Sequence, residues 1–409
     1  MPLTVSLTFP IFALALADDG LPPVSERAMK VHQAGMLFDG HNDLPWEFRR
    51  KGDMAFAEFD IARKLPVGQT DIPRLRKGGV KAQFWSVYIP SGHPNPARTV
   101  VEQIDLVHRM IERYPDDLAL ALTADDVEKA VKDGKIASLI GIEGGIAIEN
   151  DLAYLRAFHR LGARYMTLTH NKTLDWADAA TDAPKHDGLT EFGERVVKEM
   201  NRLGMLVDLS HVAPSTMADA LRVSKAPVIF SHSSARALCD VPRNVPDAIL
   251  RELPKNGGVV MVNFYSGFLV PNARAKLNAQ TEALKKKYPD EKEFEKEFQA
   301  WMKGAKEVRG TIGTVCDHID QIVKMAGIDH VGLGSDFDGI NGWPIGLDDV
   351  SDFPRITEEL LKRGYSESDV HKVLGGNALR AFRGAGEVAA ELQKTTRPEV
   401  DPPARYKED

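Results

Sequence analysis

The feature that most constrains the fold of this 409-residue chain is the alternation of short apolar runs with amphipathic stretches. The apolar runs number eight and lie at 36–40, 80–89, 136–142, 164–169, 204–209, 227–231, 257–264 and 330–335. Helical patterns lie between them at 98–113, 124–132, 150–161, 189–202, 214–223, 245–253 and 316–326. Runs that stay apolar, instead of alternating with polar residues, are typical of parallel strands buried on both faces. Eight of them separated by helices predict an α/β fold, the (β/α)8 TIM-type barrel.

Two further stretches add to the predicted barrel. An insertion at 273–308, rich in Lys and Glu, stands between the seventh and eighth runs. Its apolar residues recur at helical spacing and include Phe294, Phe298, Trp301 and Met302. We expect a helical insertion that lies either over the mouth of the barrel or out in the solvent. Residues 355–394 predict extra C-terminal helices and 395–409 a flexible tail, so the barrel domain spans 30–394.

The chain opens on an apolar stretch. Residues 1–17 end in Ala15-Leu16-Ala17 and are followed by two aspartates, as a secretory signal peptide is at its cleavage site. The Lys or Arg that usually stands near the start of such a signal is missing. We predict a periplasmic or secreted protein, with an apolar arm on a cytoplasmic protein as the alternative. No later segment is long and apolar enough to cross a bilayer, so we expect no transmembrane span.

Composition excludes several classes of function. The formal net charge is −7, and no basic stretch is dense enough to bind nucleic acid. The two cysteines, Cys239 and Cys316, are too few for a disulfide framework or a cysteine zinc site, although one disulfide between them stays open. Any metal site must therefore use His, Asp and Glu side chains.

Polar residues follow six of the eight apolar runs, at the ends where barrel enzymes carry their active sites. These endings are Asp39-Gly40-His41-Asn42-Asp43, Glu143-Gly144-Gly145, His170-Asn171, Asp208-Leu209-Ser210-His211, Ser231-His232-Ser233-Ser234 and Ser335-Asp336-Phe337-Asp338-Gly339. Each residue alone has an ordinary structural explanation, such as a hydrogen-bonded histidine or a helix N-cap. Together around one ring, they would be costly to bury without a cation. The remaining histidines fall in helices, in loops or at a strand start and are interpreted as structural.

The spacing of these residues predicts a metal centre. His41 and Asp43 are two residues apart, so strand geometry places both on one face. Such a nitrogen and oxygen pair suits Zn²⁺ better than Ca²⁺ or Mg²⁺. His211 and His232 end neighbouring strands and can supply two more nitrogens. Glu143 could reach two ions about 3.5–4 Å apart with its two oxygens.

Two other residues would complete a hydrolytic site. A pair of metal ions would polarise a carbonyl and lower the pKa of a shared water. Asp336 would then be free to take the proton of that water and return it to a leaving amine. His170 is placed to donate a hydrogen bond to the developing oxyanion.

At these residues the chain resembles the membrane dipeptidase family, also called renal dipeptidase-like, among the amidohydrolase-type metal barrels. The resemblance spans roughly 30–385 and runs in order through GHNDLPW (40–46), GIEGG (141–145), LTHN (168–171), VDLSH (207–211), SHSSARAL (231–238), PRNVPD (242–247) and GLGSDFDG (332–339). It implies the barrel fold and hydrolysis of dipeptides, often with tolerance of a C-terminal D-residue.

The resemblance also implies a role for each site residue. His41 and Asp43 would hold one zinc and His211 and His232 the other, with Glu143 bridging the two Zn²⁺ ions of the chain. His170 would contact the scissile carbonyl or oxyanion, Arg243 would bind the substrate carboxylate, and Asp336 would handle the proton.

The chain departs from the vertebrate members of that family in three respects. It carries the insertion at 273–308, it has only two cysteines in place of the vertebrate disulfides, and its C-terminus is charged rather than apolar. We therefore expect no lipid anchor. As partners we expect small dipeptide substrates, no nucleic acid, and a second copy of the chain in a homodimer.

Two alternatives stay open beside the zinc dipeptidase. One is another binuclear-metal amidohydrolase that acts on a cyclic amide or lactone. Such enzymes often carry a modified lysine at the end of the fourth strand, and Lys172 lies near that position. The other alternative is a non-catalytic binding protein on this scaffold, which predicts missing ligands, whereas all five ligands and Asp336 are present. Zincin, serine-hydrolase and P-loop motifs are absent from the sequence.

Overall fold

The structure is a computed structural model that describes residues 21–399, apart from residues 53 and 58. The signal peptide predicted at 1–17 and the last residues of the predicted tail, 400–409, lie outside the described residues.

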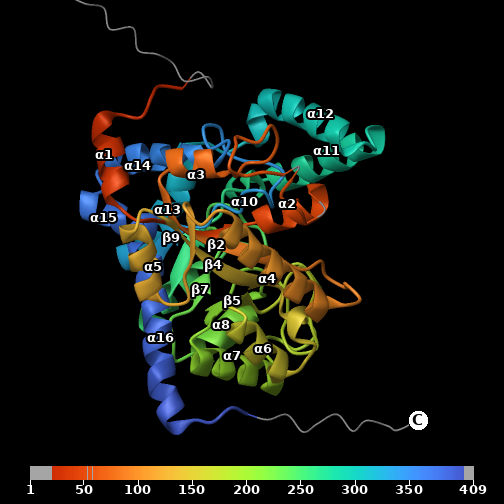
Figure 1. Ribbon diagram of the computed structural model, residues 1–409, viewed down its shortest axis with the longest axis vertical. Coiled ribbons are helices and arrows are strands. Elements are labelled where there is room, and N and C mark those ends of the chain that lie inside the picture. Colours follow the sequence, from red (N-terminus) through yellow and green to blue (C-terminus); the bar gives the residue numbers. More distant parts are fainter. Residues whose placement is uncertain (1–20, 53, 58, 400–409) are drawn as a thin grey trace, which may run out of the picture.

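Parallel strands close into a barrel at the centre of the molecule (Figure 1). The strands are β1 (Leu37–Asn42), β2 (Val80–Tyr88), β3 (Leu118–Leu120), β4 (Ile136–Glu143), β5 (Ala163–Thr167), β6 (Leu206–Asp208), β7 (Ile229–Phe230), β8 (Val259–Val262) and β9 (Val331–Leu333). Neighbours follow the order β2-β1-β9-β8-β7-β6-β5-β4, and the pairing of β2 with β4 closes the ring. The predicted (β/α)8 barrel is confirmed, and each predicted run corresponds to one of its eight strands.

One strand was missing from the prediction. The three residues of β3 pair with the first half of β4, beside the edge that β5 occupies further along (Leu118↔Ile136, Ile140↔Ala163). Ala119 and Leu120 are only partly buried, so β3 is not one of the fully buried strands that the apolar runs were used to find.

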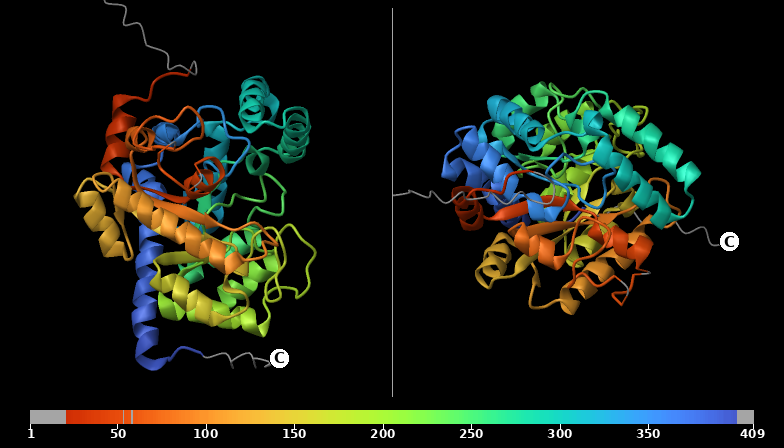
Figure 2. Two further views of the ribbon diagram at one scale, coloured as in Figure 1. Left: turned by 45° about the vertical axis from the view of Figure 1, so that its right-hand side comes forward. Right: turned by 90° about the horizontal axis from the view of Figure 1, so that it is seen from above.

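Helices surround the barrel on its outer side (Figure 2). They are α1 (Glu26–Ala34), α2 (Leu44–Lys51), α3 (Ile72–Lys77), α4 (Pro96–Arg113), α5 (Ala124–Lys132), α6 (Leu152–Arg160), α7 (Glu191–Leu203), α8 (Pro214–Val223), α9 (Asp247–Asn256), α10 (Ser266–Leu269), α11 (Ala273–Lys287), α12 (Glu291–Gly304), α13 (Ile312–Ala326), α14 (Pro354–Lys362), α15 (Glu367–His371) and α16 (Asn377–Thr395). Local chemistry sets several boundaries. The α5 helix begins at a capping box between Thr123 and Asp126, and α7 ends at Gly204, whose φ of 77° favours glycine.

An apolar layer fills the interior of the barrel below its mouth. Phe84 and Tyr165 pack with ring centroids 4.7 Å apart, and Phe382 of α16 closes the layer from the opposite end. Gly141 on β4 is required here, because a Cβ at this position would lie 2.0 Å from the Tyr165 ring. The absence of a side chain on Gly141 therefore leaves Tyr165 the room to reach the site above.

The insertion forms a helical hairpin of α11 and α12 at the same end of the molecule as α2 (Figures 1 and 2). Its inner side is an apolar cluster, in which Leu277, Phe298 and Met302 are buried against residues of the loops that follow β8 and β9. Glu295 of α12 forms ion pairs with Lys51 and, at 3.7 Å, with Arg50, both on α2. The hairpin is thus attached to the barrel at two separate places.

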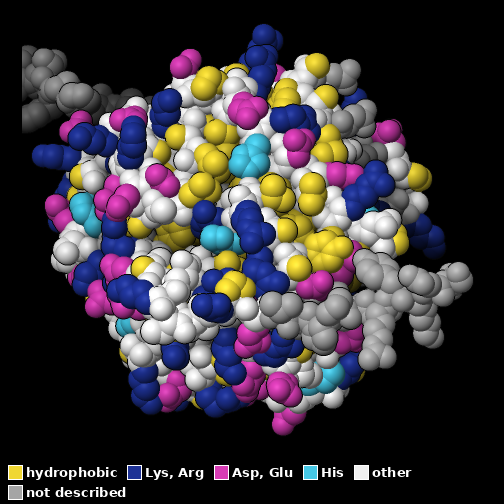
Figure 3. Space-filling view, turned by 60° about the horizontal axis from the view of Figure 1, so that its bottom comes forward, with side chains coloured by type: hydrophobic (Ala, Val, Ile, Leu, Met, Phe, Trp, Pro, Cys, Tyr) yellow, Lys and Arg dark blue, Asp and Glu magenta, His cyan; other side chains and the backbone are white. Residues whose placement is uncertain are grey.

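The described surface agrees with the charge balance of the sequence. On the face shown in Figure 3, Lys and Arg side chains are interspersed with Asp and Glu rather than gathered in one basic stripe. Within the described part of the chain, none of the helices is both long enough and apolar enough to cross a membrane.

Candidate active site

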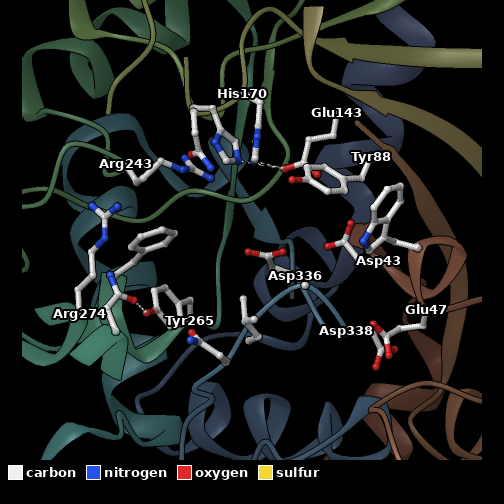
Figure 4. Close-up of a pocket in the computed structure, with 18 of the residues that line it drawn as sticks. Asp43, Glu47, Tyr88, Glu143, His170, Arg243, Tyr265, Arg274, Asp336 and Asp338 are labelled. Atoms are coloured by element: carbon white, nitrogen blue, oxygen red, sulfur yellow. Dashed lines mark hydrogen bonds and ion pairs between the residues drawn. The ribbon is translucent and has the colours of Figure 1, made fainter. Parts of the chain in front are cut away.

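A cavity of about 430 Å³ opens at the C-terminal ends of the barrel strands. The site residues predicted from the sequence all lie at it, six in its wall and two, His41 and His232, in contact with Glu143 from below. The six in the wall are Asp43, Glu143, His170, His211, Arg243 and Asp336 (Figure 4). Together with His41 and His232 they come from the ends of six strands or the loops that follow them, so only the closed barrel brings them together.

Glu143, the last residue of β4, lies at the centre of this group. Its Oε2 is 3.6 Å from Nε2 of His41, whereas its Oε1 is 3.0 Å from Nε2 of His211 and 3.5 Å from Nε2 of His232. The two oxygens therefore face two different sets of histidine nitrogens. This is the arrangement a carboxylate needs if it is to bridge two cations.

Asp43 and Asp336 complete the first of these sets. Nε2 of His41 lies 3.3 Å from Oδ2 of Asp43 and 4.0 Å from Oδ1 of Asp336. Burial disfavours a charge on the His41 ring, but Tyr165, Asp43 and Glu143 together raise its pKa well above the ordinary value. The surroundings of His41 thus stabilise positive charge.

The donor atoms fit metal ions. Nε2 of His211 and Nε2 of His232 approach to 2.9 Å, and burial holds the pKa of both rings well below the ordinary value. Two neutral imidazoles therefore direct nitrogens into one small space beside a carboxylate. Nε2 of His41 is buried without a hydrogen-bond partner among the described residues. Three overlapping groups of ligand atoms result, His41–Glu143–His232, Glu143–His170–His211 and His41–Asp43–Asp336.

A set of hydrogen bonds orients two of the histidines. Nδ1 of His41 lies 2.7 Å from the Tyr165 hydroxyl, and Nδ1 of His232 lies 2.8 Å from Oγ of Ser231. The Ser231 hydroxyl donates to Asp208 at 2.6 Å, which leaves its oxygen to accept from Nδ1–H of His232. The His232 ring is then held with Nε2 free of hydrogen as a ligand atom, and the contact with Tyr165 fixes the orientation of the His41 ring.

Asp336 is held in an unusual backbone conformation. Its φ is 62°, in the left-handed region that few residues other than glycine adopt, and such strain is concentrated at functional sites. Oδ2 accepts a hydrogen bond from Nδ2 of Asn263 at 2.8 Å, so Oδ1 is the oxygen that faces the ligand cluster. Burial, with Asp43 and Glu143 nearby, raises the pKa of Asp336 well above its ordinary value.

His170 stands on the opposite side of Glu143. Its Nδ1 lies 3.3 Å from the Ser91 hydroxyl, and its Nε2 lies 3.7 Å from Oε1 of Glu143, beyond hydrogen-bond distance. Burial lowers the pKa of His170, so the ring is neutral. If Nδ1 accepts from Ser91, then Nε2–H is a donor directed at the cavity.

Arg243 forms a cationic part of the cavity wall. Its side chain is 2% exposed, and its guanidinium makes only long hydrogen bonds of 3.4 Å, to Oγ of Ser233 and the carbonyl of His232. Within the described part of the chain, no carboxylate lies within ion-pair distance of it. Burial lowers the pKa of Arg243 to about 10. The surface ion pairs with Asp240 or Asp247 that one would otherwise expect for this loop residue are not formed; Asp240 pairs with Arg236 instead.

Other candidate residues lie elsewhere. The side chain of Lys172 is 65% exposed and pairs with Asp182, so it does not support the alternative with a modified lysine. Cys239 and Cys316 are both buried and free, which answers the open question of a disulfide. His318 hydrogen-bonds to backbone atoms of Ala235 and Leu269, as expected for a structural histidine.

Sequence reasoning missed the residues that support the ligands. Tyr165, Ser231 and Asn263 were not assigned roles, because each sits within or next to an apolar run and has no distinctive spacing. The one sequence signal for such supporting residues was a polar residue inside an otherwise apolar strand, and Asp39 and Asp208 are two examples. Asp208 accepts four hydrogen bonds beneath the site.

Comparisons with known proteins identify the family of this chain. Residues 25–396 match the family model described as membrane dipeptidase, peptidase family M19. Dipeptidase 3 of Mus musculus is 40% identical over 391 residues, which cover 94% of this chain and 71% of the mouse protein. Dipeptidase 3 of Rattus norvegicus is also 40% identical, over 374 residues that cover 90% of this chain and 68% of the rat protein.

Solved structures resemble the fold over most of the chain. The probable dipeptidase PvdM from Pseudomonas aeruginosa superposes with a TM-score of 0.76 at 25% identity, over 89% of this chain and 98% of that protein. A metallo peptidase from Rhodobacter sphaeroides, solved with a phosphinate mimic of the dipeptide L-Ala-D-Ala, gives a TM-score of 0.71 at 25% identity, over 86% and 99%. The resemblance drawn from the sequence motifs is confirmed, and the chain belongs to the membrane dipeptidase family of metal-dependent dipeptidases.

Proposed function

We propose that this protein hydrolyses the peptide bond of free dipeptides at a centre of two zinc ions. His41 and Asp43 would hold one ion, His211 and His232 the other, and Glu143 would bridge them. The observation that carries the proposal is the position of Glu143, whose two oxygens face separate groups of buried nitrogens. Nitrogen and carboxylate oxygen ligands favour zinc over the harder divalent cations.

Arg243 supports a substrate with a free carboxylate. Its buried guanidinium lies in the same cavity as Glu143 and His170 and has no carboxylate partner among the described residues. A guanidinium can bind a carboxylate through two parallel hydrogen bonds. A substrate held there by its C-terminal carboxylate would place the preceding peptide bond near the metal ligands. A cavity of about 430 Å³ suits a short substrate.

Asp336 would transfer the proton of the reaction, and His170 would donate a hydrogen bond. When bound, the two ions would supply the Lewis acidity that polarises the scissile carbonyl and makes water acidic enough to attack it. Oδ1 of Asp336 would accept a proton from the attacking water and return it to the leaving amine. Nε2–H of His170 would donate to the oxygen that gains negative charge in the transition state.

We propose further that the enzyme accepts a D-residue at the C-terminal position. The carboxylate held by Arg243 and the carbonyl next to the ligands would fix two points of the substrate. The side chain between them is then free to project to either side. The Rhodobacter sphaeroides structure, which holds a mimic of L-Ala-D-Ala, is a relative that binds such a ligand.

Comparing free and C-amidated dipeptides tests the proposed function. We expect hydrolysis of free dipeptides, including L-Ala-D-Ala, and little hydrolysis of their C-amides. Arg243→Ala should raise KM strongly, since removing one member of a buried charge pair costs about 2–5 kcal/mol. Arg251→Ala, which removes a 61% exposed arginine from α9, is the matched control. Equal hydrolysis of free and amidated dipeptides, or an unchanged Arg243→Ala enzyme, would contradict the carboxylate role.

A further inference from the structure

We infer that the α11–α12 hairpin adds a second anion-binding position to the substrate cavity, centred on Arg274. This position selects dipeptides whose C-terminal residue carries a side-chain carboxylate. The inference rests on the proposed function, because it assumes that Arg243 holds the main-chain carboxylate of the same substrate.

Arg274 belongs to the cavity although it comes from the insertion. It lies in the first turn of α11 and lines the cavity together with Asn278, one helical turn further on. The guanidinium carbon of Arg274 lies 5.8 Å from the centroid of the Phe268 ring, and that of Arg243 lies 5.1 Å from the same centroid. A single aromatic ring therefore positions both cations on one wall (Figure 4).

Neither arginine forms an ion pair with a residue that the structure describes. Among the residues that the structure describes, no carboxylate lies within 4 Å of Arg274 or Arg243. Other cations close to the same end of the barrel are paired: Lys51 with Glu47 and Glu295, and Arg309 with Asp348 at 2.8 Å. Asn278, the polar neighbour of Arg274 on α11, is occupied by the Tyr265 hydroxyl, which donates to its Oδ1 at 3.3 Å.

The charges of the cavity are arranged by side. Arg243 and Arg274 lie on one side, Asp43, Asp338 and Glu47 lie on the other, and Asp336 lies between them, as Figure 4 shows. Arg50, which also lines the cavity, is paired with Glu47 at 2.8 Å. Burial is the main cause of the lowered pKa of Arg243, and the charge of Arg274 lowers it slightly further, so the two guanidiniums repel each other. An anion between them removes that repulsion, and a ligand with two carboxylates can satisfy both.

The chemistry of the ligand follows from this pairing. A dipeptide has one main-chain carboxylate, and Arg243, as the buried arginine, would bind it. A second carboxylate on the same side of the scissile bond can only come from the side chain of the C-terminal residue. Aspartyl and glutamyl residues are therefore the class that uses Arg274, whereas their amides have the same shape without the charge.

Matched acid and amide substrates test the inference. We would measure kcat/KM for Ala-Asp against Ala-Asn and for Ala-Glu against Ala-Gln with the metal-replete full chain. The expected acid-to-amide ratio for the natural enzyme is roughly tenfold or more, the size of one charge-assisted hydrogen bond. Arg274→Ala should bring the ratio close to one, and Arg274→Lys should restore part of it. Raising the salt concentration should lower the ratio in the natural enzyme, because part of the side chain is exposed.

The control variant is Lys276→Ala, which removes the same charge from the exposed face of α11 and should leave the ratio unchanged. Equal ratios in the natural enzyme and Arg274→Ala would overturn the inference and leave the proposed function standing, provided that the neutral dipeptides are hydrolysed. A fall in the Lys276→Ala ratio as large as that of Arg274→Ala would also overturn it, since the effect would then be one of general charge. Failure to hydrolyse any dipeptide would overturn the proposed function and this inference with it.

Discussion

Asp336 is the residue whose orientation most directly supports its proposed role in proton transfer. Its backbone at a φ of 62°, its bond from Asn263 and its distance of 4.0 Å from His41 all direct Oδ1 toward the ligand cluster. The proposed ligands of the two ions are His41, Asp43, His211 and His232, with Glu143 as the bridge. Asp336 is not among them. The proposed function thus assigns it proton transfer rather than metal binding.

Asp336→Asn should therefore keep both ions and lose most of the rate. The amide preserves the shape and the contact with Asn263 but cannot accept a proton, and general acid–base catalysis contributes about 10²–10⁴-fold. Steady-state kinetics combined with metal analysis of the same sample checks this. Asp240→Asn, a change at a side chain that is 93% exposed, is the control. Near-normal turnover by Asp336→Asn with its metals bound would remove Asp336 from the mechanism.

At the residue scale, the ligands could be predicted from the sequence and their support could not. His41, Glu143, His211 and His232 each follow a recognisable apolar run, and a barrel brings all such ends to one place. Tyr165 reaches His41 only because Gly141 on the neighbouring strand lacks a side chain. That relationship depends on the register between β4 and β5, which no local pattern encodes.

Among the elements, the α11–α12 hairpin is the addition to the barrel that borders the cavity. Its inner cluster packs Leu277 and Phe298 against the loops after β8 and β9, and its α11 helix contributes Arg274 and Asn278 to the wall. On the α12 side, Glu295 pairs with Lys51 in a partly buried setting, where the exposed fractions of the side chains are 22% and 14%. This second attachment keeps α12 beside α2.

Glu295→Gln should loosen α12 without unfolding the barrel. Removing one partly buried ion pair costs little global stability, because the apolar cluster of the hairpin stays intact. We expect faster backbone hydrogen exchange in α12, with an apparent melting temperature within a few degrees of the natural protein. Glu297→Gln on the same helix is the control. Unchanged exchange in α12 would show that the ion pair with Lys51 does not hold the hairpin.

The elements themselves were predictable where the pattern was long enough. The helices predicted at 124–132 and 214–223 coincide with α5 and α8. The partly buried strand β3 was not predicted. The sequence pattern predicted that the insertion is helical but left open whether it lies over the mouth of the barrel or in the solvent. That choice depends on contacts between residues far apart in the chain, such as the ion pair of Glu295 with Lys51 of α2.

For the molecule as a whole, stability should depend on pH through buried histidines away from the metal ligands. His318 of α13 accepts a hydrogen bond at Nδ1 from the Ala235 amide and lies with Nε2 at 3.2 Å from the Leu269 carbonyl. His318 thereby connects α10 with the loop that follows β7. Burial lowers the pKa of His318 to about 4, because a charged ring would lose the bond from Ala235 and its hydration.

The pKa of this histidine is about 6.5 in an unfolded chain, so acid favours the unfolded state. The stabilisation is fully present above pH 6.5 and is lost as the pH falls toward 4, by up to about 3 kcal/mol. Urea unfolding between pH 7.5 and 4.5 measures the slope of the free energy of unfolding. His318→Gln, which does not titrate, should be less stable at pH 7.5 yet have a shallower slope. A variant slope equal to that of the natural protein would contradict the shifted pKa.

The assembly and location of the whole molecule stay predictions. Light scattering on the purified protein tests the homodimer, and the mass of the exported chain tests cleavage after residue 17.

The central claim is that Glu143 bridges two metal ions in a dipeptide-hydrolysing site, and metal stoichiometry tests it most directly. Elemental analysis of active protein, purified without chelators, should give two zinc ions per chain, and Glu143→Gln should lose zinc together with nearly all activity, because both ions share that carboxylate. One metal or none in fully active protein, or two tightly bound ions in Glu143→Gln, would contradict the account.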